Sequence, residues 1–394
     1  MLMMEENKSK NYDDFDMIKL EGENATDGLF SPFTFIFFSL FIVLCGLVAI
    51  YSATFDLSVK NGLVHYSYLI NQVYGILAGV VVGIVLRFIP FRILKRSYYV
   101  LCPLSFVILI MMFYPSFNTD GVFTLLGTKI ISGAVVATCA VIALISGAIP
   151  TIYEKRMEVP GVFFTLVLSC AMALAVLTAL TTGMGYYFLI VLVVLIMLHA
   201  SGAKKSFIVL AAIFSFATGI FMIVIQPVVL DDFFHSILPV SNPEFYNHDL
   251  FTSQLAIKDG GISGMGIGKG LYKLGVLSDV GGKFIFASIT EEVGLVGILA
   301  LYVSFLCLFF LGVMASRRAY KKNDNYLSGL SLGLAGFVFI AAIINGLYCV
   351  GLFPFGAVNL PFFSYGPGDE AMFIALSFVQ YRIIYLMGRK HEII

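Results

Sequence analysis

The residues that could do chemistry are concentrated in one polar stretch, from Leu230 to Lys283. Its carboxylates could act as general acids or bases, and its lysines could hold an anion by charge. Apolar residues such as Phe233, Tyr246 and Leu255 are interspersed, so we expect a folded cap, with a tethering loop that carries no site as the alternative. The charged and histidine residues are Asp231, Asp232, His235, Glu244, His248, Asp249, Lys258, Asp259, Lys269, Lys273, Asp279 and Lys283.

Glycine is dense in the middle of this stretch, where residues 260–270 read GGISGMGIGKG. Because glycine tolerates positive φ angles, the run predicts tight turns rather than helix. Backbone N–H groups in such turns can cradle a phosphate, but without a surrounding strand and helix this signal alone is weak.

The rest of the chain has the composition of a membrane protein. Of its 394 residues, 59% are hydrophobic and 12% are charged, against roughly 25% charged in soluble domains. The net charge of zero gives no indication of a nucleic-acid partner. The six cysteines lack the spacing of metal ligands, so we expect no metal site. No cofactor is evident, and a divalent cation is left open.

A helix that crosses the hydrocarbon needs about 20 apolar residues. Ten segments meet this requirement, so we predict an all-α integral membrane protein with about ten transmembrane helices. The segments are about 32–54, 67–89, 98–115, 130–149, 160–180, 184–200, 206–229, 285–316, 326–350 and 361–387.

Lysine and arginine are divided unevenly between alternate loops. One set of loops is basic at 87–96, 155–156, 204–205 and 317–322, whereas the other short loops carry only Lys60 and Lys129. The positive-inside rule therefore predicts cytoplasmic termini and an extracytoplasmic loop at 230–283, between helices seven and eight. The membrane domain is then residues 32–387, flanked by a disordered tail at 1–31 and a short tail at 388–394.

Few ionisable groups fall within the predicted spans, and those present, such as Glu154 and His199, lie at helix ends. Charges at mid-depth usually mark ion or proton pathways. Their scarcity argues against a proton-coupled transporter. We therefore expect polar chemistry in the outer loop and at the outer ends of the helices.

Several motifs occur in order along the chain. They are SQLAI at 253–257, GGISGMG at 260–266, FIFASITEEVGLVG at 284–297, GLFPFG at 351–356 and LPFFSYG at 360–366. With GLVAIYSA at 46–53 and Gln72, they resemble the SEDS family (shape, elongation, division and sporulation), whose members include FtsW, RodA and SpoVE. The resemblance extends over about residues 35–387 and agrees with the ten predicted helices.

The resemblance implies a glycosyltransferase that polymerises lipid II into peptidoglycan strands at the outer face of the bacterial cytoplasmic membrane, in cell division or cell shape. It implies membrane lipids, a class B penicillin-binding protein and other divisome or elongasome proteins as partners. Such chemistry needs a base for an acceptor sugar hydroxyl and cationic or dipolar groups for the donor pyrophosphate. The family's proposed base is an aspartate directly before the Phe-Ile-Phe-Ala run, and that position is Lys283 here. A lysine is normally protonated at neutral pH, so the expected base is missing.

Other charged family motifs are also reduced, at 118–123, 130–133 and 182–186, and the family's Ser-Tyr-Gly-Gly-Ser-Ser becomes SYGPGD at 364–369. The acids that could substitute for the base are Asp279, four residues before Lys283, and the Asp369-Glu370 pair. Asp369 replaces a family serine on the outer surface. We expect it to form an ion pair with Lys283 that keeps the lysine charged.

The resemblance also places a substrate cleft on the outer surface. Because neighbouring helical residues point about 100° apart, only one of the two adjacent glutamates should face it. Structural roles remain open as alternatives: turns forced by proline, hydrogen bonds between helices, and solvated carboxylates. The expected substrate-binding residues are Ser364, Tyr365, Gly366, Glu291, Glu292, Ser253 and Lys283.

Three functions therefore compete. The first is a glycan-strand polymerase of the FtsW/RodA type with a relocated base. The second is a catalytically degenerate homologue that binds lipid II or a penicillin-binding protein and regulates wall synthesis. The third, a flippase for lipid-linked precursors, is weakest because charges at mid-membrane are scarce.

Overall fold

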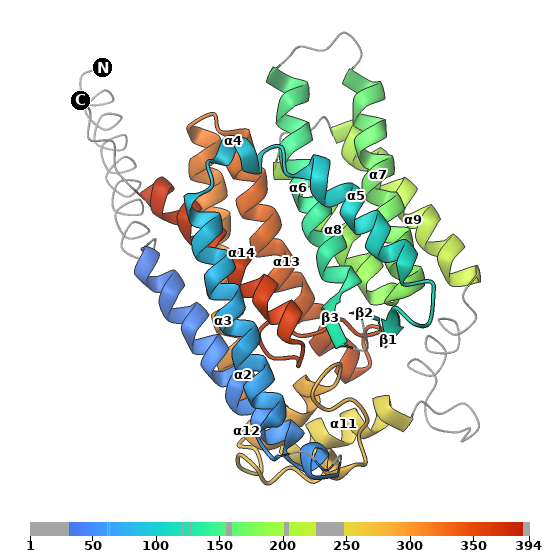
Figure 1. Ribbon diagram of the computed structural model, residues 1–394, viewed down its shortest axis with the longest axis vertical. Helices are drawn as coiled ribbons and strands as arrows, with labels where there is room; N and C mark the ends of the chain where they lie inside the picture. Colours follow the sequence, from blue (N-terminus) through green and yellow to red (C-terminus); the bar gives the residue numbers. More distant parts are fainter. Residues whose placement is uncertain are drawn as a thin grey trace, which may run out of the picture.

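The computed structural model describes residues 31–60, 62, 64–119, 121–125, 128–154, 160–200, 205–225 and 248–388. The predicted terminal tails, apart from one residue of each, and the start of the polar stretch lie outside the described residues. Within the described part, the architecture is a bundle of apolar helices with a folded cap at one end (Figure 1).

Each of the ten predicted membrane segments contains one helix. Among the described residues, seven helices are long and apolar enough to cross a membrane, and α5, α6 and α8 are shorter apolar helices. The all-α, multi-pass prediction is thus confirmed. The helices are α2 (Pro32–Lys60), α3 (Ser67–Phe88), α5 (Tyr98–Met111), α6 (Gly133–Glu154), α7 (Pro160–Thr181), α8 (Met184–Ala200), α9 (Lys205–Ile225), α12 (Ile285–Lys321), α13 (Asn325–Val350) and α14 (Pro367–Gly388).

Two predicted helix starts are wrong. Residues 130–132 are not the start of a helix but belong to strand β3 (Thr128–Ser132), which pairs with β2 (Val122–Leu125) in an antiparallel sheet that β1 (Asn118–Thr119) completes. The adjacent β-branched residues Ile130 and Ile131 suit a strand, and helix α6 begins only at Gly133. The last helix starts at Pro367 rather than at residue 361, since proline fits the first helical position.

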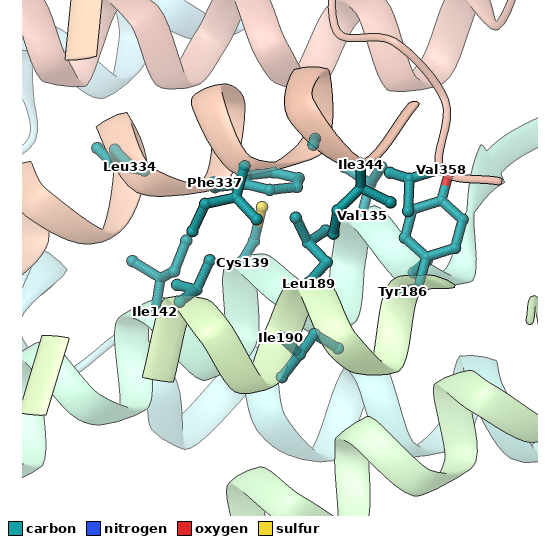
Figure 2. Packing of buried hydrophobic residues seen from close by; sticks show 14 of the residues in the cluster. Val135, Cys139, Ile142, Tyr186, Leu189, Ile190, Leu334, Phe337, Ile344 and Val358 are labelled. Carbon is teal, nitrogen blue, oxygen red and sulfur yellow. The ribbon is translucent and has the colours of Figure 1, made fainter. Parts of the chain in front are cut away.

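Buried apolar residues of α6, α8 and α13 pack against one another (Figure 2). Val135 and Cys139 of α6, Leu189 of α8 and Phe337 of α13 are all buried and belong to one apolar cluster. Helix α13 is buried along most of its length, whereas α3 and α9 keep much of their apolar surface exposed. Exposed apolar surface on outer helices is what a lipid environment favours.

Helices α3 and α14 approach closely because α3 presents a stripe of glycines. A Cβ atom would lie 2.3 Å from the carbonyl oxygen of Pro367 if built on Gly75, and 2.6 Å from that of Ala371 if built on Gly79. Such small residues at helical spacing allow two backbones to touch within a membrane. The contact also brings Gln72, on the same face of α3, to the start of α14.

The cap is formed by residues 248–284, which contain helix α11 (His248–Gly260) and the 3-10 turn η2 (Tyr272–Leu274). It covers the lower end of the bundle in Figure 1, and the short helix α4 (Phe91–Leu94) lies at the opposite end. This part of the polar stretch is therefore folded, as its apolar residues predicted. The basic segment at 87–96 includes α4, so this segment and the cap lie at different ends of the bundle.

Candidate functional site

The site begins at a break in helix α12. Gly294 has φ 69° and ψ −174°, which separates residues 285–293 from the long remainder of the helix. The break leaves two carbonyls and two N–H groups that an unbroken helix would have paired with each other. The glycine-rich segment makes a hydrogen bond to each of these four backbone groups. Met265 N donates to Glu291 O and Gly266 N to Glu292 O, both at 2.9 Å, while Leu295 N donates to Gly261 O at 3.0 Å and Val296 N to Ile262 O at 3.2 Å.

This arrangement explains the density of glycine in the segment. Gly264 has φ 75°, and a Cβ atom there would lie 2.2 Å from the carbonyl oxygen of Glu292. Its own N–H donates to Gly260 O at 2.8 Å. The hypothesis that these amides cradle a phosphate is wrong for residues 264–266, because their N–H groups already bind protein carbonyls. The turns that the glycines predicted are confirmed.

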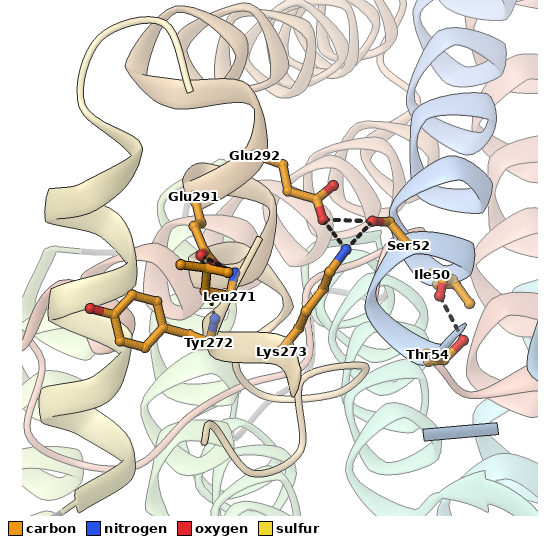
Figure 3. Close-up of polar contacts among 8 residues, drawn as sticks. All are labelled: Ile50, Ser52, Thr54, Leu271, Tyr272, Lys273, Glu291 and Glu292. Carbon is orange, nitrogen blue, oxygen red and sulfur yellow. Dashed lines mark hydrogen bonds and ion pairs between the residues drawn. The ribbon is translucent and has the colours of Figure 1, made fainter. Parts of the chain in front are cut away.

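Glu291 is buried beneath the cap rather than solvated. Its Oε1 atom accepts hydrogen bonds from the backbone N–H groups of Leu271 and Tyr272 (Figure 3). Its Oε2 atom is buried and has no hydrogen-bond partner among the described residues. The side chain therefore fixes the start of η2. On the far side of η2, the Tyr272 hydroxyl donates to Asp259 Oδ2 at 2.7 Å, and this bond raises the pKa of Tyr272 to about 12.

Glu292 is also buried, but it points in another direction and pairs with Lys273. The Lys273 Nζ atom lies 2.5 Å from Glu292 Oε1 and 2.8 Å from Ser52 Oγ, and Ser52 Oγ donates to the same glutamate oxygen at 2.6 Å. The three side chains come from η2, α12 and α2 and converge as drawn in Figure 3. Buried charges need both a partner and hydrogen bonds, and this triad supplies them.

A second anchored element is the turn that leads into α12, residues 279–283. Three successive carbonyls accept hydrogen bonds from other segments, which fixes the turn against the rest of the bundle. Tyr365 N donates to Gly281 O at 2.6 Å, Ser364 Oγ to Gly282 O at 3.0 Å, and Asn345 Nδ2 to Lys283 O at 3.0 Å. The side chains of Asp279 and Lys283 are exposed at this turn.

Gln72 of α3 holds the neighbouring segment, residues 364–370. Its Oε1 atom accepts from Gly366 N at 3.2 Å, and its Nε2 atom donates to Glu370 Oε2 at 3.2 Å. Both Gln72 and Glu370 are buried, and Glu370 Oε1 has no partner within the described residues. This contact depends on the glycine stripe of α3, which places Gln72 within reach of α14.

Tyr365 is half-buried between these two anchored elements. Its ring packs edge-on against Tyr68 at a centroid distance of 4.9 Å, and its hydroxyl accepts from Asn71 Nδ2 at 3.3 Å. Burial raises the pKa of the Tyr365 hydroxyl, which therefore stays protonated at neutral pH and can donate a hydrogen bond. Lys129 of β3 is exposed and close enough to interact electrostatically with it.

Two of the predicted site residues are engaged inside the protein. Ser253 Oγ donates to Cys349 O and to Leu250 O, both at 2.8 Å, so its hydroxyl links α11 to α13. Asp369 is buried and its Oδ1 atom accepts from Ser132 N at 2.7 Å. The predicted ion pair between Asp369 and Lys283 is wrong, because Asp369 is bound by strand β3 while Lys283 is exposed.

The structure brings Ser364 and Tyr365 next to the turn at 279–283, but it places both glutamates beneath the cap. Sequence reasoning missed Ser52, Lys273 and Asn345 as parts of the site. Asn345 offered a signal, since a polar amide within an apolar span usually has a specific partner. Among the described residues, no group of three or more His, Cys, Asp or Glu side chains could hold a metal ion.

Known relatives match both sequence and fold. The probable peptidoglycan glycosyltransferase FtsW of Trichlorobacter lovleyi is 27% identical over 334 residues, 82% of this chain and 84% of its own. The corresponding FtsW of Halothiobacillus neapolitanus is 29% identical over 174 residues, which cover 44% of this chain and only 40% of that protein's length.

Two solved structures share the fold. A chain of a peptidoglycan synthase complex that coordinates polymerization and crosslinking superposes with a TM-score of 0.67 at 16% identity, covering 90% of this chain and 97% of the other. The rod shape determining protein RodA of Thermus thermophilus gives a TM-score of 0.61 at 16% identity, with 89% and 95% covered. The sequence pattern of the FtsW, RodA and SpoVE family, described as cell cycle proteins, matches residues 33–384. The chain therefore belongs to this SEDS family of multi-pass proteins of the bacterial inner membrane.

Proposed function

We propose that this protein is a peptidoglycan glycosyltransferase that joins lipid II units into glycan strands at the outer face of the membrane. The observation that carries the proposal is the turn at 279–283, which holds an exposed carboxylate and an exposed ammonium group beside Tyr365. Acceptor activation needs a proton acceptor, and the departing pyrophosphate needs a cation or hydrogen-bond donors. Asp279, Lys283 and the Tyr365 hydroxyl supply groups of these kinds.

The relatives support the proposed partner and substrate. A solved relative is part of a complex that couples polymerization to crosslinking, which supports a class B penicillin-binding protein as the partner of this chain. The substrate, lipid II, is supported by the relatives whose names describe peptidoglycan glycosyltransferases.

Polymerisation of purified lipid II tests the proposal. We expect the purified protein in detergent, alone or with a class B penicillin-binding protein, to convert fluorescent lipid II into a ladder of glycan strands on a gel. The ladder should disappear on digestion with a muramidase. Lipid II that stays monomeric under every condition, despite measurable binding, would contradict the proposal.

A second function is favoured by a specific observation, namely Lys283 at the family's base position with Asp369 buried against β3. In that reading the chain binds lipid II or a penicillin-binding protein without catalysis. Binding without any polymer, in the same assay, is the result that would select it.

We also propose that the cap faces the outside of the cell. The exposed residue Lys258 on α11, changed to cysteine, should react with a membrane-impermeant thiol reagent in intact spheroplasts, since basic loops stay inside. Lys322→Cys, in the basic connection that follows α12, serves as the matched position and should react only after lysis. The reverse pattern would overturn this orientation.

Tyr365 should contribute to substrate binding. The Tyr365 hydroxyl can donate a hydrogen bond to a phosphate or sugar oxygen of the substrate. Tyr365→Ala is therefore expected to weaken lipid II binding about tenfold, which corresponds to a loss of roughly 1–2 kcal/mol of binding free energy. Tyr365→Phe separates the hydroxyl from the ring. Tyr74→Ala, on the exposed face of α3, is the control and should bind as wild type. Unchanged binding by Tyr365→Ala would make the residue structural only.

A further inference from the structure

We propose that Asp279 is the proton acceptor of this chain and that Lys283, at the position where the family resemblance implies a base, binds the leaving pyrophosphate. The inference rests on the proposed function, because it assigns roles within that reaction. Both roles stay within the turn at 279–283, but the base is Asp279 instead of residue 283.

The position of the Asp279 carboxylate carries the inference. Its Oδ2 atom accepts a hydrogen bond from the backbone N–H of Lys283 at 3.1 Å, so an acid lies against the backbone of the residue that replaces the base. Asp279 is exposed, so its carboxylate is accessible to a substrate. An acid four residues away in sequence thus lies beside residue 283 in space.

The chain has features that make room for this carboxylate. Asp279 has φ 43°, a left-handed conformation that aspartate and asparagine adopt more readily than most residues. A Cβ atom on Gly282 would lie 2.3 Å from Asp279 Oδ1, so any larger residue there would displace the carboxylate. The Asp279 carbonyl is fixed as well, since it accepts from Gly282 N at 3.0 Å. Together with the three bound carbonyls of the turn, these contacts hold the acid in place before substrate arrives.

Six other described acids near the cap are less suitable. Asp369 and Glu370 are buried in the start of α14, and Glu291 and Glu292 are buried beneath the cap. Asp249 and Asp259 lie on α11 rather than on the turn, where they accept hydrogen bonds from Ser278 and from the Tyr272 hydroxyl. Asp279 is the acid that is exposed at the turn bound by Ser364 and Tyr365.

The reaction joins two sugars and releases the lipid carrier with its pyrophosphate. The acceptor sugar oxygen forms a bond to the anomeric carbon of the donor, and its proton passes to a carboxylate oxygen of Asp279. The anomeric carbon–oxygen bond to the pyrophosphate breaks, and the electron pair leaves on the polyprenyl pyrophosphate. The exposed ammonium group of Lys283 stabilises that negative charge, for which a point charge on a flexible stem is suited.

Replacement of Asp279 by asparagine tests the assignment. Asparagine keeps the left-handed conformation and can still accept from the Lys283 N–H, but its neutral amide is a far weaker proton acceptor. We expect the rate of lipid II polymerisation to fall by about 10²–10⁴-fold with lipid II binding retained. Asp279→Glu should recover part of the rate. The matched control is Asp259→Asn, an exposed acid of the same cap, which should stay within about twofold of wild type.

Two failures are distinguishable. If wild type makes no polymer, the proposed function fails, and the assignment of a catalytic role to Asp279 fails with it. If wild type polymerises and Asp279→Asn keeps its rate to within about threefold, which is far less than the loss of a base costs, the function stands and the assignment is overturned. A Lys283→Asp variant adds an independent reading. It should restore only part of the rate to Asp279→Asn, because it returns an acid to the neighbouring position but removes the cation that binds the pyrophosphate.

Discussion

Lys273→Met is expected to destabilise the protein by about 3–5 kcal/mol, because it leaves Glu292 as a buried charge without its cation. The pair lies beneath the cap with both side chains 5% exposed, so water does not replace the lost partner. The effect should be measured as a lower thermal midpoint of the detergent-solubilised protein and as faster proteolysis within the cap. Activity should fall in parallel, since the triad ties η2 and α12 to α2.

The double variant Lys273→Met/Glu292→Leu separates charge from packing. Removing both charges should recover much of the lost stability, since buried ion pairs replaced by apolar residues are often neutral. Lys269→Met, an exposed lysine of the same cap, is the matched control and should change stability by less than about 0.5 kcal/mol. If Lys273→Met is as stable as wild type, the triad does not hold the cap.

Gly79→Leu is expected to be comparably damaging through a different mechanism. Its Cβ atom alone would lie 2.6 Å from the carbonyl oxygen of Ala371, so α3 and α14 must separate. Overpacking of this kind costs about 1–3 kcal/mol or more, and the separation also pulls Gln72 from Gly366 and Glu370. We expect a lower thermal midpoint and weaker lipid II binding.

The control for this change is Val82→Leu, at an exposed position of the same helix. It adds apolar volume toward lipid and should leave both measurements unchanged. Equal effects of the two substitutions would show that close contact between α3 and α14 is not what positions the site.

The sequence was sufficient for the helices because a span depends on local composition. About 20 apolar residues suffice to identify one, and each predicted segment contains a helix. The short sheet was missed because Ile130 and Ile131 read equally well as the start of an apolar helix. Only their pairing with Phe123 and its neighbours decides the strand.

The site was harder to predict, because contacts between residues far apart in the sequence decide which charged side chains are buried and which groups they pair with. Glu291 and Glu292 are adjacent and resemble interfacial acids, but the break at Gly294 and the folded cap bury both. In the sequence, Lys273 is one of several lysines in the loop. Only the fold shows that it binds Ser52, which lies 221 residues earlier in the chain. Asp369 was assigned to the surface because nothing in the sequence indicates that Ser132 would bind it.

The glycine run shows the same limit at a smaller scale. Its turns were predictable, and Gly261, Gly264, Gly266 and Gly268 all have positive φ angles. Their purpose was not, because the partners of the turn are the carbonyls of a broken helix farther along the chain. A sequence pattern indicates which conformations the backbone can adopt, whereas the hydrogen-bond partners of that backbone are known only from the fold.

The release of polyprenyl pyrophosphate shows whether this protein forms glycosidic bonds with Asp279 as the proton acceptor. Wild-type protein in proteoliposomes, supplied with lipid II, should release one polyprenyl pyrophosphate for each glycosidic bond formed. The Asp279→Asn variant should still bind lipid II, but its rate of polyprenyl pyrophosphate release should be about 10²–10⁴-fold lower. Tight lipid II binding by wild type with no released pyrophosphate lipid, alone and with a penicillin-binding partner, would contradict the account and identify the chain as a binding protein.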